Sequence, residues 1–187
     1  LWNHPGWPDK KSTMYPLQKQ LIKEGRIHAV ELFNGSEWYP RVLDWFDEYK
    51  LPMMANSDMH DSSRFVYGNK VRPMTLVFAK EATLESLREA LFAGRMVALF
   101  DDTLAGDSKH LEQLIEASLQ VKVINEKKGL IQITNISDIE FRALYGERMN
   151  PVIFRPRTAI CLTVPKGTVL NFINCYAGRQ TVKKEIW

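Results

Sequence analysis

An aspartate and a histidine two residues apart form the part of the chain best suited to chemistry. Asp58 and His60 follow the apolar segment 51–55, whose composition is typical of a short buried strand. In extended chain, side chains at positions i and i+2 point to the same face, so both groups can reach one ion. The carboxyl ends of strands are also where α/β proteins usually carry their chemistry. The sequence therefore predicts that Asp58 and His60 bind one metal ion.

His4 is a third candidate ligand. Pro5 and Gly6 follow it, and a turn of this composition leaves the imidazole free to project from a strand end. A single histidine more often serves packing or hydrogen bonding. Two histidines and an aspartate at expected strand ends of one domain strengthen the case for a metal site without settling it against the structural alternative, and these ligands suit Mn²⁺, Zn²⁺ or Fe²⁺.

The elements that would position these residues alternate between strand and helix up to about residue 118. The pattern predicts strands over 28–33, 51–58, 74–78 and 96–100, and helices over 14–23, 37–50, 83–93 and 109–117. Thr83 is a good N-cap and Gly94 a good C-terminal stop for the third helix. Because the strands are apolar on both faces, the fold class predicted for residues 1–117 is α/β, with a parallel sheet or barrel.

The chain from residue 118 onward has a different pattern, in which short strands follow one another with turns between them. About six or seven strands in roughly 70 residues favour a small all-β sandwich of immunoglobulin-like kind with a structural or binding role. We therefore predict two domains, residues 1–117 and 118–187.

Composition excludes several classes of protein. The 187 residues are 45% hydrophobic and 25% charged, enough for a sizeable core. The net charge of +3 is too small and too evenly interspersed to indicate nucleic acid or an anionic membrane as a partner. No apolar run approaches the ~20 residues of a membrane span, and no leader is visible. Because the chain opens on Leu1, we expect further residues before it.

The two cysteines, Cys161 and Cys175, have a separation that matches no zinc-binding spacing. They are compatible with a disulfide in an oxidising compartment or with two thiols in a reducing one. The sequence leaves that choice open, and with it the choice between a bacterial cytoplasm and periplasm.

Three motifs, taken in order, resemble the later motifs of the PHP (polymerase and histidinol phosphatase) domain family. They are Asn3-His4-Pro5, the strand and turn Val-Glu-Leu-Phe-Asn-Gly at 30–35, and Ser-Asp-Met-His at 57–60. The similarity continues through 75–80 and 84–91 and so covers most of residues 1 to about 117. Bacterial PHP phosphoesterases with a small C-terminal β-sandwich are the members that the chain resembles most.

The resemblance implies a distorted, TIM-like β/α barrel of seven strands, of which residues 1–117 would be the C-terminal part. Its mouth would hold two or three divalent metal ions and hydrolyse phosphate monoesters or diesters of a phosphorylated small molecule or nucleotide. By the same resemblance His4, Asp58 and His60 would be metal ligands and catalytic residues.

Other residues in or beside these motifs would support the site or contact the substrate. Glu31 and Asn34 lie in the matching motif, and we expect Glu31 to be a buried support of the ligands. Asn3, Asp61 and Arg64 are further candidates. Arg64 could clamp a phosphate with two hydrogen bonds, although a solvated loop arginine is the commoner case.

The chain departs from the family pattern in one respect. The opening His-x-His element and the middle acidic and histidine ligands have no counterpart, and we expect them in a barrel segment that precedes Leu1. The remaining histidines, His28 and His110, are interpreted as structural. The chain would therefore hold an incomplete metal site, and hydrolysis by these residues alone is not expected.

Three classes of protein remain open. The first is a metal-dependent phosphoesterase whose other ligands come from the missing barrel segment. The second is a non-catalytic binding or scaffolding relative, which would bind no metal. The third is an amidohydrolase-like metal hydrolase, which would need a metal-bridging lysine, and Lys50, Lys70 and Lys80 are not well placed for that role. We favour the first.

Overall fold

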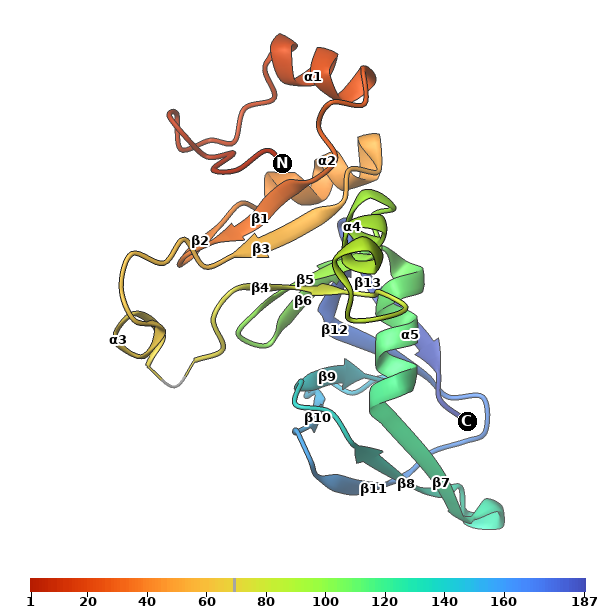
Figure 1. The fold of residues 1–187 in the computed structure, drawn as a ribbon. Coiled ribbons are helices and arrows are strands. Elements are labelled where there is room, and N and C mark those ends of the chain that lie inside the picture. The colour runs from red at the N-terminus through yellow and green to blue at the C-terminus, as the bar shows by residue number, and fades with distance from the viewer. Residues whose placement is uncertain (69) are drawn as a thin grey trace.

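The computed structural model describes residues 1–68 and 70–187, which form a mixed α/β fold with a curled half-barrel sheet (Figure 1). The first part contains α1 (Pro16–Lys23), β1 (Val30–Asn34), β2 (Glu37–Trp38), α2 (Arg41–Tyr49), β3 (Met53–Asn56), α3 (Ser63–Tyr67), β4 (Met74–Val77), α4 (Leu84–Phe92), β5 (Met96–Phe100), β6 (Thr103–Gly106) and α5 (Ser108–Ser118). The second contains β7 (Leu119–Asn125), a 3-10 turn (Glu126–Lys128), β8 (Leu130–Asn135), β9 (Phe141–Leu144), β10 (Val152–Phe154), β11 (Ala159–Thr163), β12 (Val169–Ala177) and β13 (Gln180–Glu185).

The half-barrel begins with a three-stranded sheet in which β1 lies between β2 and β3. The β1–β3 pairing is parallel, as the sequence predicts for this region. The side chain of Thr75 then connects β4 to β3. The hydroxyl of Thr75 donates to the carbonyl of Ala55 (2.9 Å) and accepts from its N–H (3.0 Å). This bridge continues the curl from β3 into the larger sheet.

The expected all-parallel arrangement is wrong beyond β3, because β4, β5 and β6 pair antiparallel. Val77 opposes Met96, so α4 leaves and re-enters the sheet at the same end and makes no crossover. β5 and β6 are joined by a two-residue turn with Asp101 at φ +55°, and such a turn can join only antiparallel strands.

The predicted helix over 37–50 is also too long. Its first residues form β2, which pairs with β1 across the Asn34–Gly35 turn, and the helix begins only after Pro40. The helix predicted after Thr83 begins where expected, and the Thr83 hydroxyl accepts from the N–H of Ser86.

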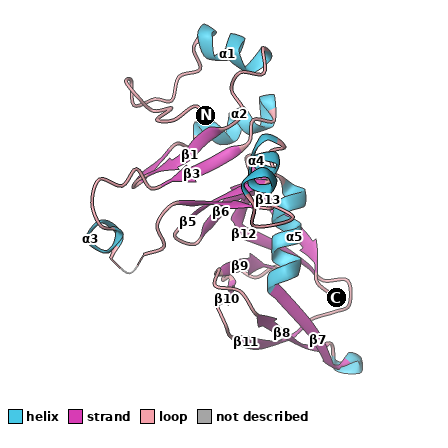
Figure 2. Ribbon diagram, viewed as in Figure 1, coloured by secondary structure: helices cyan, strands magenta, loops and turns pink. Residues whose placement is uncertain are grey.

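The elements after α5 are strands joined by loops, with one 3-10 turn after β7 (Figure 2). β11, β8 and β7 form one antiparallel sheet. β12, however, pairs parallel with β6 and antiparallel with β9, so one sheet runs from β4 to β10 through both halves of the chain. The change to strands begins at the end of α5, beside the predicted boundary at 117/118, and the division into two domains stays a prediction.

Two apolar cores lie on either side of this shared sheet. One surrounds α5 and includes Leu111, Phe141 and Phe172, and the other joins β1, β3 and α2. Cys175 belongs to the first core, where burial raises the pKa of its thiol. Cys161 is exposed and both cysteines are free, so they are two thiols. Within the described residues, no helix has the length and apolar character of a membrane span.

The hairpin between β12 and β13 contacts the outer side of α2. Arg179 forms two hydrogen bonds with the carboxylate of Asp44 (2.5 and 2.7 Å), and its backbone N–H donates to Asp47 (3.0 Å). The Arg179 guanidinium lowers the pKa of Asp44. Gly178 makes this contact possible, because a Cβ there would lie 1.8 Å from Oδ1 of Asp47.

We expect Gly178→Ala to lower the free energy of unfolding by about 2 kcal/mol, measured by urea denaturation. Two effects contribute to this loss of stability: alanine is strained in the left-handed conformation of Gly178, and its Cβ would displace Asp47 from its hydrogen bond with Arg179. Gly146→Ala is the matched control, because Gly146 has a similar φ (+55° against +62°) with open space around it. It should cost only about 1 kcal/mol. Equal losses in the two variants would mean that the Asp47 contact contributes nothing.

Candidate functional site

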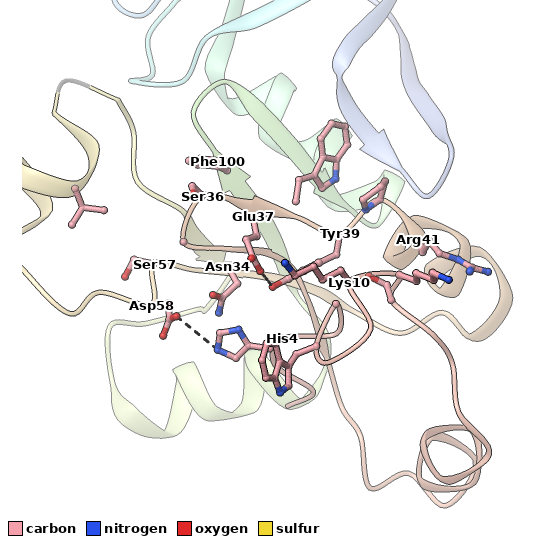
Figure 3. Close-up of a pocket in the computed structure, with 18 of the residues that line it drawn as sticks. His4, Lys10, Asn34, Ser36, Glu37, Tyr39, Arg41, Ser57, Asp58 and Phe100 are labelled. Atoms are coloured by element: carbon pink, nitrogen blue, oxygen red, sulfur yellow. Dashed lines mark hydrogen bonds and ion pairs between the residues drawn. The ribbon is translucent and has the colours of Figure 1, made fainter.

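An open cavity of about 1400 Å³ lies where the N-terminal loop meets the ends of β1 and β3 (Figure 3). Three of the candidate site residues line it, namely His4, Asn34 and Asp58. Aromatic side chains form much of the wall, and four cations and two carboxylates supply its charge. These residues are Trp7, Trp38, Tyr39, Tyr67 and Phe100, then Lys10, Lys11, Arg41 and Lys70, then Glu37 and Asp58.

His4 and Asp58 point toward one another across the cavity (Figure 3). Nε2 of His4 is 3.8 Å from Oδ2 of Asp58, and each side chain is about 40% exposed. Metal–ligand bonds to imidazole nitrogen and carboxylate oxygen are about 2.0–2.2 Å long, so both atoms can bind one ion at this separation. The two residues are 54 positions apart in sequence, and the fold brings them together.

Glu31 lies beneath this pair and connects the three segments that form the site. Its carboxylate accepts from the backbone N–H of His4 (2.7 Å), from Nδ2 of Asn34 (2.9 Å) and from Nδ2 of Asn56 (2.6 Å). Glu31 is 2% exposed, so these donors replace the water that its carboxylate would otherwise bind. The arrangement fixes the His4 turn to the carboxyl ends of β1 and β3.

The backbone at the site is unusual. His4, Lys10, Ser12 and Asp58 line the cavity and have φ between +45° and +56°. Left-handed conformations are uncommon outside glycine and occur often at functional sites. The expectation that Asp58 and His60 lie in extended chain is therefore wrong. β3 ends at Asn56, and the chain turns at Asp58.

His60 has a different position from that expected. Its Nδ1 lies 2.8 Å from the carbonyl oxygen of Asp58, so the ring folds back on the turn. That contact leaves Nε2 as the nitrogen available to a metal. Asp61 accepts from the N–H of Ser62 and is exposed, and Asn3 is also exposed. Arg64 lies on α3 and is not among the described residues that line the cavity.

The donors present make part of a metal site. Within residues 1–68 and 70–187, no group of three or more His, Cys, Asp or Glu side chains is placed to hold an ion. His4 and Asp58 suit one divalent ion, but two protein ligands are fewer than such ions usually have in proteins. The other histidines pack against aromatic rings, His28 against Phe92 and His110 against Phe78.

Two tyrosines lie near the Asp58 carboxylate. Burial raises the pKa of Tyr39, as do its hydrogen bond to Glu37 and the charges of Glu31 and Asp58. Burial and the charge of Asp58 likewise raise the pKa of Tyr67, whose hydroxyl donates to the carbonyl of Ser57 (2.7 Å). Both phenols are neutral at physiological pH, and each donates its one proton to a protein acceptor, Tyr39 to Glu37 and Tyr67 to Ser57.

No motif in the sequence indicated Lys10 or Arg41 as residues of the cavity. Lys10 lies in the loop before α1 and Arg41 is the first residue of α2. Neither belongs to a motif, and only the fold brings them to one cavity. Arg64, which follows the Asp-x-His element in sequence, is not among the described residues that line the cavity, and its role as a phosphate clamp stays a prediction.

The fold is PHP-related by comparison with solved structures. The chain is similar to a two-domain protein from Bacteroides vulgatus that contains a predicted PHP-like metal-dependent phosphoesterase, with a TM-score of 0.87 and 26% sequence identity. The match covers 99% of this chain and 60% of that protein, so this chain spans less than two thirds of its length. No family model and no curated protein matches the chain.

Proposed function

We propose that the protein is a metal-dependent phosphoesterase of PHP type, in which His4, Asp58 and His60 are metal ligands. The observation that carries the proposal is the 3.8 Å approach of His4 to Asp58 at the edge of a large cavity with more cations than carboxylates. The similarity to a protein containing a predicted PHP-like metal-dependent phosphoesterase supports it.

In this proposal the remaining metal ligands come from residues outside the chain, in the earlier part of a seven-stranded barrel of which the half-barrel sheet is the C-terminal part. The strands after α5 would then form the accompanying sandwich. The reason for this part of the proposal is that the described residues bring only His4 and Asp58 together, and these two with His60 are too few for a site of two or three metal ions. Mn²⁺, Zn²⁺ and Fe²⁺ all suit imidazole and carboxylate ligands.

The bound metal would supply a water of lowered pKa and a positive charge for the phosphate oxygens. The residues of the chain would then have separate tasks. Glu31 holds the backbone of His4 in place, and Asp58 accepts or passes on a proton at its carboxylate. Tyr39 and Tyr67 form part of the cavity wall, with their hydroxyls donating to Glu37 and to the carbonyl of Ser57, while the cavity cations attract the anionic substrate.

The test is hydrolysis of p-nitrophenyl phosphate and bis(p-nitrophenyl) phosphate by the intact protein with Mn²⁺, Zn²⁺ or Fe²⁺ added. We expect release of p-nitrophenol from at least one substrate. Chelation should lower the rate at least ~100-fold, because the metal supplies both the nucleophile and charge stabilisation. A rate that is insensitive to chelator, or no release with any of the three metals, would contradict the proposed function.

A further inference from the structure

The cavity is larger than a phosphate monoester alone requires. Cavities that bind small molecules commonly measure about 300–1000 Å³, and this one measures about 1400 Å³. The His4–Asp58 pair occupies one side of it (Figure 3). Space therefore remains for a leaving group that extends well beyond the phosphate.

The charges along that space are distributed unequally. His4 and Asp58 lie on one side, Arg41 lies on the other, and Glu37, Tyr39 and Lys10 lie between them (Figure 3). The substrate phosphate at His4 and Asp58 would thus have Tyr39 between it and Arg41 (Figure 3). A second positively charged region exists at a distance from the proposed metal ligands.

The carboxylates near this second region already accept hydrogen bonds from other donors. Across the described part of the chain, no ion pair within 4.0 Å involves Lys10 or Arg41. Arg41 is close enough to Asp44 to help lower the pKa of that carboxyl, but both Asp44 oxygens already accept from Arg179. Glu37 accepts from the Tyr39 hydroxyl.

Lys10 lines the cavity, and hydrogen bonds define the backbone of the turn in which it lies. Its φ is +56°, and its N–H donates to the carbonyl of Gly6 (2.6 Å). Asp9, the residue before it, accepts from the N–H of Lys11 and from the hydroxyls of Thr13 and Tyr15. These hydrogen bonds define the turn that contains Lys10. They also mean that the carboxylate of Asp9 already accepts from three donors.

We propose that Lys10 and Arg41 bind a second anionic group of the substrate, so that the preferred substrate is a phosphate ester whose leaving group itself carries a phosphate or a carboxylate. This inference rests on the proposed function, because it assigns the first phosphate to the His4–Asp58 side. A cationic pair without ion-pair partners gains most from an anion that is bound away from bulk water.

The test uses phosphonates, which bind without being hydrolysed. Binding of propylphosphonate, propane-1,3-bisphosphonate and 4-phosphonobutyrate to the intact, metal-loaded protein is measured by calorimetry. We expect the bisphosphonate or the phosphonobutyrate to bind at least tenfold more tightly than propylphosphonate. Whichever of the two is preferred identifies the second anion as a phosphate or a carboxylate.

The variant Lys10→Gln/Arg41→Gln should lose that preference, so that the dianionic probe binds at least tenfold more weakly while propylphosphonate changes less than twofold. Lys122→Gln, an exposed lysine on β7, is the matched control and should bind all probes as the wild type does. Equal affinity of the wild type for all three probes, equal losses for all probes in the double variant, or no binding of any probe would overturn the inference. Failure of the proposed function is a different result, namely no phosphate-ester hydrolysis while the preference for a second anion persists.

Discussion

Asp58→Asn is expected to lower the rate of metal-dependent phosphate-ester hydrolysis by at least ~100-fold. Loss of groups that merely orient metal ligands costs about ten- to a hundredfold, so loss of a direct anionic ligand should cost at least as much. The amide keeps the size of the side chain but removes its charge. It also cannot accept a proton from a metal-bound water. The measurement is kcat/KM for p-nitrophenyl phosphate at saturating Mn²⁺.

The matched control is Asp138→Asn, which removes an exposed aspartate that pairs with Arg157 in the second part of the chain. It should leave kcat/KM within about twofold of the wild type, since exposed ion pairs contribute little. If Asp58→Asn retained more than a tenth of the wild-type kcat/KM, Asp58 would not be a metal ligand in the reaction.

Glu31→Ala is expected to lower the free energy of unfolding by about 3 kcal/mol or more. The substitution leaves three donors, the N–H of His4 and the side-chain amides of Asn34 and Asn56, without the acceptor that they share. Each buried donor left unpaired costs about 1–3 kcal/mol, although water entering from the cavity offsets part of this. Urea denaturation followed by tryptophan fluorescence measures the loss.

A double-variant cycle separates this network from a general loss of packing. Asn34→Ala removes one of the donors, so Glu31→Ala/Asn34→Ala should be less destabilised than the sum of the two single variants by about 1 kcal/mol. Glu116→Ala, at an exposed carboxylate that pairs with Lys184, should change the free energy of unfolding by less than about 0.5 kcal/mol. Strict additivity of Glu31 and Asn34 would show that their hydrogen bond does not stabilise the fold.

Local signals predicted most of the helices and several strands. Thr83 and Gly94 flank α4 at its two ends, as expected. The strands β4 and β5 lie within a residue or two of their predicted positions. These elements have capping residues and continuous apolar segments, which are properties of short stretches of sequence. β6 was missed, because its four residues, Thr103–Gly106, have no apolar run and directly follow a turn.

Strand pairing was harder to predict, because it depends on contacts between distant residues. A helix between two strands usually makes a parallel crossover, yet α4 returns to the same end of the sheet. The parallel contact of Cys175 with Leu104 joins strands about 70 residues apart, and nothing in either strand's own sequence specifies it. The shared sheet could therefore be seen only in the structure.

The candidate site was predictable where it rested on motifs. His4 and Asp58 were chosen from motifs far apart in sequence, and the structure places them 3.8 Å apart. The chain conformation between Asp58 and His60 was not predicted, because a left-handed aspartate has the same sequence signature as an extended one. Lys10 and Arg41 lie outside every motif, and their relation to the site comes from the fold alone.

Binding of Mn²⁺ to the intact protein, followed by the paramagnetic resonance signal of the free ion, tests the central claim most directly. The wild type should bind Mn²⁺, and His4→Ala, Asp58→Ala and His60→Ala should each weaken that binding at least ~10-fold, with Asp138→Asn as the unaffected control. Unchanged stoichiometry and affinity in the His4 and Asp58 variants would contradict the account, because the two side chains that the fold brings together would then not hold a metal.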